Sequence, residues 1–476
     1  MKHISRTNKR EVSAKQVICK ESFKMSTTLA DSKPMFSNRD LVRLTIPLVF
    51  DALLVLVAGL VDSVMVSSSG EAAVSAVALV DSLNLVFLMA FSSVVNGGVV
   101  VTSQYVGRGN MDDAQTSAKQ LIYLAAIVSL TLTATLLFTY SPILRLVYGG
   151  VEADVFEGAK TYFFWIILGY PFVSVGAGCT ALMRSMGKNK LSVMLTSGCN
   201  LLNVVGNAIL IFGFDMGIAG AAISTSFSRV IYAVCGLLVM HNKHLKIHFT
   251  DLFKVKLNGG ILKKIAVIGG TTGIESALFQ IGKVLISSLM ATFGTIAIAG
   301  YSVSYSINNI AWSMLGAFTT SLIPIVGQAM GAGRIDEAKM YTKKMTTAAT
   351  VTMVILFGTI FLLRNQLVMM FDFEPDALRE AAYYTGVAAV LSILSFYSWS
   401  FLPVGAFRAA GDVRYGLVVA ILTMFIFRVG GAFLLSGYFK MGVVGIYLGM
   451  WADWFARAVM NFFRYRSGKW LTKKVI

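Results

Sequence analysis

The sequence predicts an all-α polytopic membrane protein with 12 transmembrane helices in two six-helix repeats. Three observations lead to this fold class: the composition, the number of long apolar stretches, and a repeat within the chain. Of the 476 residues, 56% are hydrophobic and only 14% are charged. A soluble chain of this length needs a polar exterior, which such a composition does not supply. We therefore expect the lipid bilayer to be the solvent of this protein.

Twelve stretches of the chain are apolar over a length that crosses a bilayer. A helix of about 20 residues spans a hydrocarbon core about 30 Å thick. The 43 glycines fit this assignment, because small residues allow membrane helices to pack closely. The predicted spans are residues 41–67, 72–104, 114–140, 158–184, 190–213, 217–240, 261–292, 294–330, 338–363, 380–407, 412–437 and 441–463.

The basic residues are distributed unevenly among the segments that connect the spans. Of the 41 lysines and arginines, 32 belong to one set of alternate segments and span ends, five to the other set, and four to span interiors. By the positive-inside rule both termini are cytoplasmic and the number of helices is even. The net charge of +17 therefore reflects topology and does not indicate a nucleic-acid partner. We expect a multi-pass protein of a bacterial-type cell membrane.

The spans and the polar segments between them divide the chain into five parts. The first 40 residues lack the apolar region of a signal peptide, so we expect a disordered cytoplasmic tail rather than a cleaved leader. A basic linker in mid-chain separates two lobes. The predicted parts are a tail at 1–40, an N-lobe at 41–240, a cytoplasmic linker at 241–260, a C-lobe at 261–466 and a second tail at 467–476.

The two lobes are related in sequence, because a shift of 224 residues aligns many identical residues. Six helices per lobe give both copies the same orientation in the membrane. Parallel repeats of this kind are typical of transporters, which place the substrate cavity between the lobes. Among the aligned pairs are Asn84 with Asn308, Gln104 with Gln328, Gly107 with Gly331, Gly109 with Gly333, and Arg184 with Arg408.

The sequence contains no constellation of histidines or cysteines that would form a catalytic or metal centre. The four histidines lie in polar segments, and the four cysteines show no metal-type or paired spacing. No G-x-x-x-x-G-K-[ST] phosphate loop occurs, so ATP does not power this chain. We therefore expect no enzyme and no cofactor, but a secondary transporter that uses an ion gradient.

Several short motifs follow one another in a fixed order between residues 36 and 470. They are Pro47, GLVDSVMV from Gly59, QYVGRGN from Gln104, LMRSMGK from Leu182, NVVGN from Asn203, GIES from Gly273, FRAAGD from Phe407 and DWFAR from Asp453. On these motifs the sequence resembles the MATE (multidrug and toxic compound extrusion) family of cation-coupled antiporters. The resemblance implies 12 helices, an N-lobe and a C-lobe that form a V, and exchange of H⁺ or Na⁺ for an amphipathic, often cationic, drug-like solute.

Intramembrane acids are functional candidates, because an uncompensated charge at the bilayer centre costs at least about 2.5–3.5 kcal/mol. The strongest is Asp62, which lies in the motif that the family uses for cation binding. Its expected partners are Asn203 and Asn207, which share one helical face with Asn200. If Na⁺ is the coupling ion, Asp62 and Asn203 are the expected metal ligands. The alternatives are an interfacial Asp62 and asparagines that only hydrogen-bond between helices.

In the C-lobe, the candidates are Glu275, Lys283 and Arg428. Better-known relatives carry their acid about one turn after Glu275, where this chain has Phe279. Lys283 follows Glu275 by eight residues, about 12 Å along a helix. It therefore either pairs with Glu275 through an extended side-chain rotamer or pairs with a residue of another helix. The alternative is a lysine that snorkels to the interface. Arg428 is a candidate counter-charge.

Further candidates complete the predicted site. Asp51 follows Pro47 by one turn, and bending of this helix is a plausible coupling motion. Tyr301 and Tyr305 are candidates for a cavity wall, with lipid-facing packing as the alternative. Two other acids have simpler expected roles. Asp81, early in the second span, is expected to lie at the membrane rim, and Asp453 is expected to form a structural i, i+4 ion pair with Arg457.

These observations favour a secondary active efflux antiporter that exchanges H⁺ or Na⁺ for amphipathic, often cationic drug-like solutes by alternating access. We expect it to act as a monomer, with a small-molecule solute and lipid as its partners. The alternative is a lipid-linked oligosaccharide flippase of the same superfamily, which would favour a more cationic central cavity and often additional helices.

Overall fold

The computed structural model describes residues 34–250, 252, 254–371, 374–473 and 475–476, so most of the predicted tail at 1–40 lies outside the described residues. The chain divides into two units, Met1–Asp40 and Leu41–Ile476. In the described part of the first unit, the Asp40 carboxylate accepts hydrogen bonds from the Ser37 backbone N–H and hydroxyl at 2.9 and 2.7 Å. This exchange caps the start of the first described helix. The second unit contains every predicted span.

The first half of the chain forms six long helical segments. They are α2 (Asn38–Ser67), α3 (Glu71–Arg108), α4 (Met111–Tyr148), α5 (Ala153–Leu168) followed by α6 (Tyr170–Ser185), α7 (Asn189–Asn207) continued by the π-helical turn η1 (Ala208–Gly213), and α8 (Gly217–Met240).

The second half repeats this order. Its segments are α9 (Gly259–Met290) with the 3₁₀ turn η2 (Ala291–Phe293), α10 (Thr295–Gly331), α11 (Ile335–Val368), α12 (Pro375–Leu394) followed by α13 (Tyr397–Ala409), α14 (Val413–Leu422) continued by the π-helical turns η3 (Thr423–Gly430) and η4 (Phe433–Tyr438), and α15 (Gly442–Ser467) with the 3₁₀ turn η5 (Lys469–Thr472).

Two of the predicted spans are broken helices. In the described part of the chain nine helices are long and apolar enough to cross a membrane, or 11 when each bent pair counts as one span. The α5/α6 pair bends by 46° and the α12/α13 pair by 54°. The first bend has a proline in the opening turn of α6, and the second has Phe396 in the left-handed region at φ 51°. With α15, which carries several charges, the segments match the 12 predicted spans.

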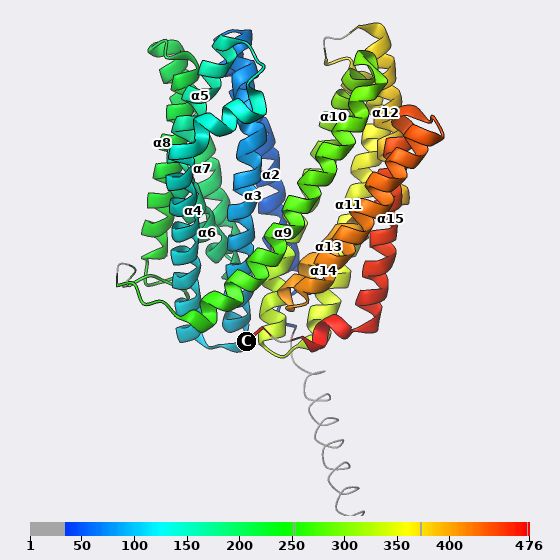
Figure 1. The fold of residues 1–476 in the computed structure, drawn as a ribbon. Coiled ribbons are helices and arrows are strands. Elements are labelled where there is room, and N and C mark those ends of the chain that lie inside the picture. The colour runs from blue at the N-terminus through cyan, green and yellow to red at the C-terminus, as the bar shows by residue number, and fades with distance from the viewer. Residues whose placement is uncertain (1–33, 251, 253, 372–373, 474) are drawn as a thin grey trace, which may run out of the picture. The chain divides into compact units, whose positions relative to one another are not determined.

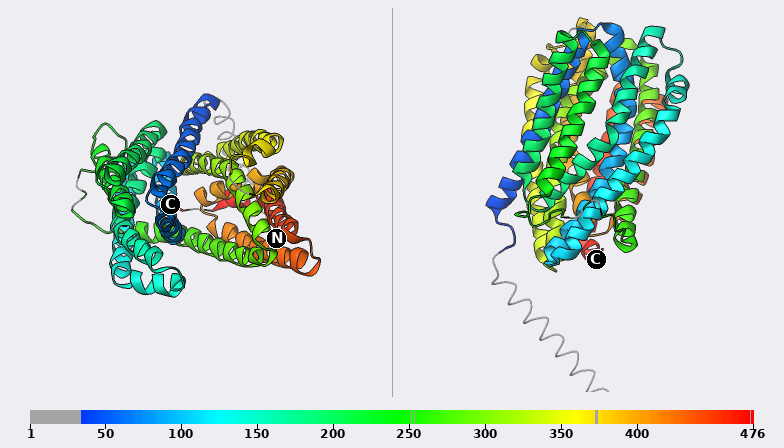
Figure 2. Two further views of the ribbon diagram at one scale, coloured as in Figure 1. Left: turned by 90° about the horizontal axis from the view of Figure 1, so that it is seen from above. Right: turned by 90° about the vertical axis from the view of Figure 1, so that its left-hand side faces the viewer.

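The two halves form two groups of helices within the second unit. In Figures 1 and 2 most first-half helices, blue to green, lie on one side and the yellow to red helices of the second half on the other, while α9, in bright green, begins beneath the first group and crosses to the second. The main contacts between the groups join α3 to α9 and α10. The junction of α3 with α9 and α10 therefore holds the two groups of helices together.

Reciprocal hydrogen bonds at this junction relate the halves by an approximate two-fold axis. Gln104 on α3 donates from Nε2 to the Ala409 carbonyl at 2.7 Å, and Gln328 on α10 donates to the Ser185 carbonyl at 2.7 Å. Both the donors and the acceptors are 224 residues apart, so the offset seen in the sequence is also an operation in space. The nearby Gly107 has no Cβ, which lets α3 approach the Gln328 backbone.

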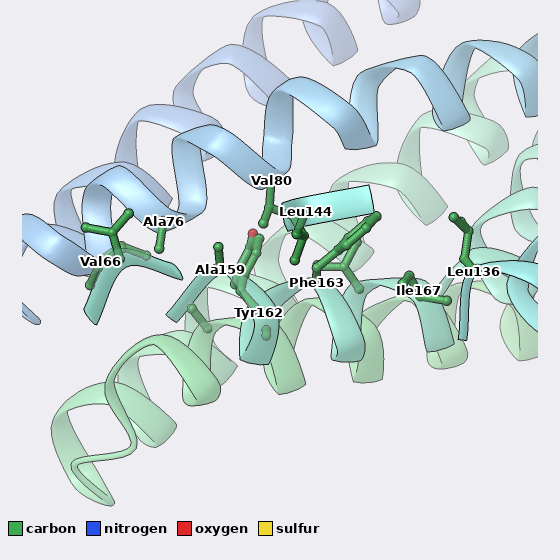
Figure 3. Packing of buried hydrophobic residues seen from close by; sticks show 14 of the residues in the cluster. Val66, Ala76, Val80, Leu136, Leu144, Ala159, Tyr162, Phe163 and Ile167 are labelled. Carbon is green, nitrogen blue, oxygen red and sulfur yellow. The ribbon is translucent and has the colours of Figure 1, made fainter. Parts of the chain in front are cut away.

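Each half has an apolar core of its own. In the first half, Val66, Val80, Leu144 and Phe163 pack between α2, α3, α4 and α5 (Figure 3). In the second half the core is rich in aromatic rings, which lie against the candidate residues of α9 and α10. The sequence repeat therefore preserves the scaffold while the side chains that fill it differ.

Candidate functional site

The α2 helix has few buried side chains, although it carries two candidate acids. Its buried residues are Leu41, Thr45, Leu48 and Val66. Only 11% of its most apolar window is buried, against 67% for α10. The segment formed by α7 and η1 is equally sparsely buried, at 11%, so both helices depend more on individual polar contacts than α10 does.

Two such contacts tie α2 to α7. The Thr196 hydroxyl donates to the Asp51 carboxylate, and the Asn207 amide donates from Nδ2 to the Asp62 carboxylate. The two acids and their two donors are each separated by 11 residues, which is about three helical turns. The helices α2 and α7 therefore run side by side in the same direction and are joined by two side-chain hydrogen bonds, which we call the two rungs.

The asparagines of α7 do not all face Asp62. Asn203, which the sequence suggested as a second partner of Asp62 and a Na⁺ ligand, donates instead to the Thr225 hydroxyl of α8 at 3.0 Å. The Asn200 Nδ2 is buried without a hydrogen-bond partner among the described residues. Asn203 and Asn207 therefore bind different helices, α8 and α2, although they share one helical face with Asn200.

Two further charges lie near Asp62. Asp81 on α3 has an exposed side chain, and Arg229 on α8 interacts electrostatically with both acids. The Arg229 Nη1 is buried without a hydrogen bond among the described residues. Arg229 was not among the predicted site residues, although its position inside an apolar span was a signal for it.

Glu275 has a partner that the sequence did not indicate. Its carboxylate lies 2.6 Å from the Arg408 guanidinium, and the two side chains are only 14% and 18% exposed. Lys283, which we considered as its partner, answers another helix, where its ammonium donates to the Tyr305 hydroxyl at 3.3 Å. In the first half, the matched Asp51 likewise interacts electrostatically with the matched arginine, Arg184.

Asp453 on α15 is buried between two arginines. The predicted i, i+4 pair with Arg457 is confirmed at 2.9 Å, and Arg428 of η3 approaches the other carboxylate oxygen to 2.9 Å. The carboxylate is fully buried and the arginines are about 5% exposed. Arg428 is therefore a counter-charge of Asp453.

The remaining candidates of the second half surround one cavity. Tyr301 and Tyr305 line it together with Lys283 and Arg428. The lysine therefore faces protein and does not snorkel. Phe279, at the position where the family resemblance led us to look for an acid, has its ring 5.4 Å from the Lys283 ammonium. The first-half site is thus acidic and amide-rich, whereas the second-half site is cationic and aromatic.

The sequence model of the MatE family matches residues 47–209 and 272–434, more than half of the chain. The chain belongs to the MATE family. The two matched segments begin at residues 47 and 272, which are 225 positions apart, so the family's repeating unit coincides with the internal repeat.

Several relatives of this MATE protein match it over almost its whole length. An uncharacterized transporter of Bacillus subtilis, YisQ, is 25% identical over 95% of this chain and 99% of its own. A probable multidrug resistance protein of Thermotoga maritima, NorM, is 22% identical over 92% of this chain and 94% of its own. Among solved structures, a MOP superfamily transporter from Pyrococcus furiosus is 19% identical, with a TM-score of 0.84 over 91% of this chain and 96% of the other.

Family membership confirms the predicted fold class and the class of protein. This MATE protein is a multi-pass membrane transporter of two six-helix repeats, and not an enzyme. The proteins named above are described as transporters or as multidrug resistance proteins, and none of these descriptions supports the flippase alternative.

Proposed function

We propose that this MATE protein is a secondary active antiporter, which exports amphipathic drug-like solutes in exchange for H⁺ or Na⁺. The observation that carries the proposal is the contact between Asp62 and Asn207, on a helix that has few other buried contacts. The name of the Thermotoga relative supports drug-like solutes as substrates. The parallel repeats support alternating access between two lobes, 41–240 and 261–466.

The coupling event in this proposal takes place at Asp62. A proton on the Asp62 carboxylate, or a Na⁺ ion bound to it, removes or screens the negative charge that the Asn207 amide now meets. A charge-assisted hydrogen bond is about twice as strong as a neutral one, so the event weakens the rung between α2 and α7. Because α2 is otherwise sparsely packed, the change shifts the equilibrium between its conformations.

The proposal includes the orientation and state of the protein. Both termini and the linker at 241–260 face the cytoplasm, as the distribution of lysine and arginine indicates. The proposed state is a monomer, in which the two repeats of one chain supply both lobes. The test of this orientation introduces single cysteines into the linker and exposes intact cells to a membrane-impermeant thiol reagent. A cytoplasmic linker stays unlabelled, so labelling of these cysteines contradicts the orientation.

The decisive experiment measures export of a cationic dye by purified protein in liposomes. Gradients of H⁺ and of Na⁺ are imposed separately, so that the coupling ion is identified in the same preparation. We expect one gradient to drive export and Asp62→Asn to abolish it. Asp112→Asn, at an exposed acid outside the predicted spans, is the matched control and should transport normally. Undiminished export by Asp62→Asn contradicts the role of Asp62.

A further inference from the structure

The second-half cavity has a volume of about 230 Å³, and the two charged residues that line it, Lys283 and Arg428, are both cationic. Lys283 comes from α9 and Arg428 from η3, while α10 contributes the phenol rings of Tyr301 and Tyr305. Ile286 and Met450 add apolar surface. Among the described residues, no acid lines this cavity. Drug-sized sites measure roughly 300–1,000 Å³, so this cavity fits one end of such a solute.

The charges around the cavity do not balance. The single carboxylate of Asp453 is shared by Arg428 and Arg457, both at 2.9 Å. The nearest acid along α9, Glu275, is paired with Arg408. In the part of the chain that the structure describes, Lys283 therefore has a phenol as its hydrogen-bond partner and no carboxylate. An excess of positive charge remains, and in a site of low dielectric it strongly favours an anion.

The aromatic faces of the site already hold the protein's own cations. The Lys283 ammonium lies 5.4 Å from the Phe279 ring centroid and 5.9 Å from that of Tyr305. Arg428 lies 5.0 Å from the Phe279 centroid and 5.6 Å from that of Trp454. Such faces are where a cationic solute would bind in other proteins. Here their occupation by lysine and arginine disfavours a second cation.

The repeat shows that the scaffold does not need these charges. At the offset of 224, Lys283 corresponds to Gly59 and Arg428 to Val204, so the first half is neutral at both positions. Conversely, Asp62 corresponds to Ile286, a residue that lines the cavity.

The helix that carries Arg428 also differs between the halves. The segment η3 is π-helical, whereas its counterpart, residues 199–206, is α-helical. Single π-helical turns occur frequently at functional sites. Both the charge and the local backbone therefore distinguish this position from its copy.

We propose that the cavity binds the anionic group of a small aromatic carboxylate, with Lys283 and Arg428 as the charge partners and the two tyrosines as donors and aromatic walls. This inference rests on the proposed export function, because it names one class of solute that the protein would carry. Zwitterionic solutes belong to this class, since their carboxylate binds in the cavity while their cationic end remains outside it.

The test compares two probes of the same shape and opposite charge. Binding of 1-naphthylacetate and of 1-naphthylmethylammonium to the purified full-length protein in detergent is measured by calorimetry. We expect saturable binding of the carboxylate and none of the ammonium compound in the cavity. Lys283→Gln should weaken carboxylate binding at least about tenfold, because it removes a charge-assisted contact, whereas Lys283→Arg should restore most of it.

The control variant is Lys264→Gln. Lys264 lies on the same helix and also contacts an aromatic ring, that of Tyr105, but it is outside the cavity. It should bind the carboxylate as the unmodified protein does. Arg428 is unsuitable as the first variant, because its loss also alters the buried pair with Asp453.

Two outcomes overturn the inference: absence of saturable carboxylate binding, and binding that is unchanged in Lys283→Gln. Dye export in liposomes separates this failure from that of the proposed function. If gradient-driven export depends on Asp62 but naphthylacetate does not bind, the inference fails and the export function stands. If naphthylacetate binds through Lys283 but no gradient drives export of either probe or the dye, the cavity assignment stands and the export function fails.

Discussion

Thr45 on α2 and Ser321 on α10 bring their hydroxyl oxygens within 3.1 Å of each other, at the contact between the two halves. Their repeat counterparts are Gly269 and Gly97, which also meet, where α9 packs on α3. A Cβ on Gly97 would lie only 2.8 Å from the Gly269 nitrogen. One contact is therefore backbone against backbone and the other rests on side-chain hydroxyls. This difference explains why α9 is firmly packed while its counterpart α2 is not.

The glycine contact gives the first prediction. Gly97→Ala and Gly269→Ala should each destabilise the protein by about 1–3 kcal/mol, because the added methyl group forces α3 and α9 apart. Gly270→Ala is the matched control, since a Cβ at Gly270 meets nothing within 4 Å. Thermal unfolding in detergent measures the difference. Equal melting temperatures for the Gly269 and Gly270 variants would show that the close approach is not needed.

The reciprocal glutamines give the second prediction. Gln104→Ala and Gln328→Ala should each cost about 1–3 kcal/mol, because each leaves a buried carbonyl without its donor. The two losses should be similar, since the hydrogen bonds have the same length, 2.7 Å. Gln366→Ala, at an exposed position on α11, should be silent. A large loss for only one of the two variants would mean that the two hydrogen bonds, although related by symmetry, contribute differently to the free energy of unfolding.

The cluster of Asp453 with Arg428 and Arg457 gives the third prediction. The loss of stability should depend on whether the substitution leaves a buried charge without a partner. Asp453→Asn leaves two buried guanidinium groups without a carboxylate and should cost about 3–5 kcal/mol. Arg457→Met leaves the pair of Asp453 with Arg428 and should cost clearly less. Asp376→Asn, in an ion pair with both side chains more than 70% exposed, should cost nothing measurable. Chemical denaturation ranks the three variants, and a mild Asp453→Asn contradicts the argument.

The two rungs between α2 and α7 give the fourth prediction. Asn207→Leu should slow gradient-driven dye export at least about tenfold, because it removes a charge-assisted contact to Asp62. Thr196→Val should stay within about threefold of normal, since Asp51 keeps its electrostatic partner Arg184. Initial rates in liposomes, normalised to protein content, measure both. The reverse ranking would place the coupling event at Asp51.

Much of the fold was predictable because it depends on local properties of the chain. Apolar length identified the spans, and identities at one offset identified the repeat. The bends within two predicted spans were not predicted, although Gly169 and the proline after it are a recognisable signal for the first. Neither were the π-helical turns, because apolar length does not distinguish an α-helical from a π-helical turn.

The candidate residues could be named from the sequence, but most of their partners could not. Asp62 and Asn207 were expected to meet, and the structure brings them together. Arg408, the partner of Glu275, lies 133 residues away in the chain, and in the sequence it stands out only by its match with Arg184. Conservation between the repeats indicated a structural residue without indicating what it binds.

By itself, the sequence determined that the bilayer is the solvent of this protein and that its two halves share one scaffold. Only the tertiary structure decided which charged groups pair with each other. Asp453 forms ion pairs with two arginines and Glu275 with a third, whereas Lys283 donates a hydrogen bond to a tyrosine hydroxyl in a cavity. The physical reason lies in the range of the interactions. Hydrophobic burial sums over whole segments, whereas an ion pair depends on a few ångströms between helices that are distant in the chain.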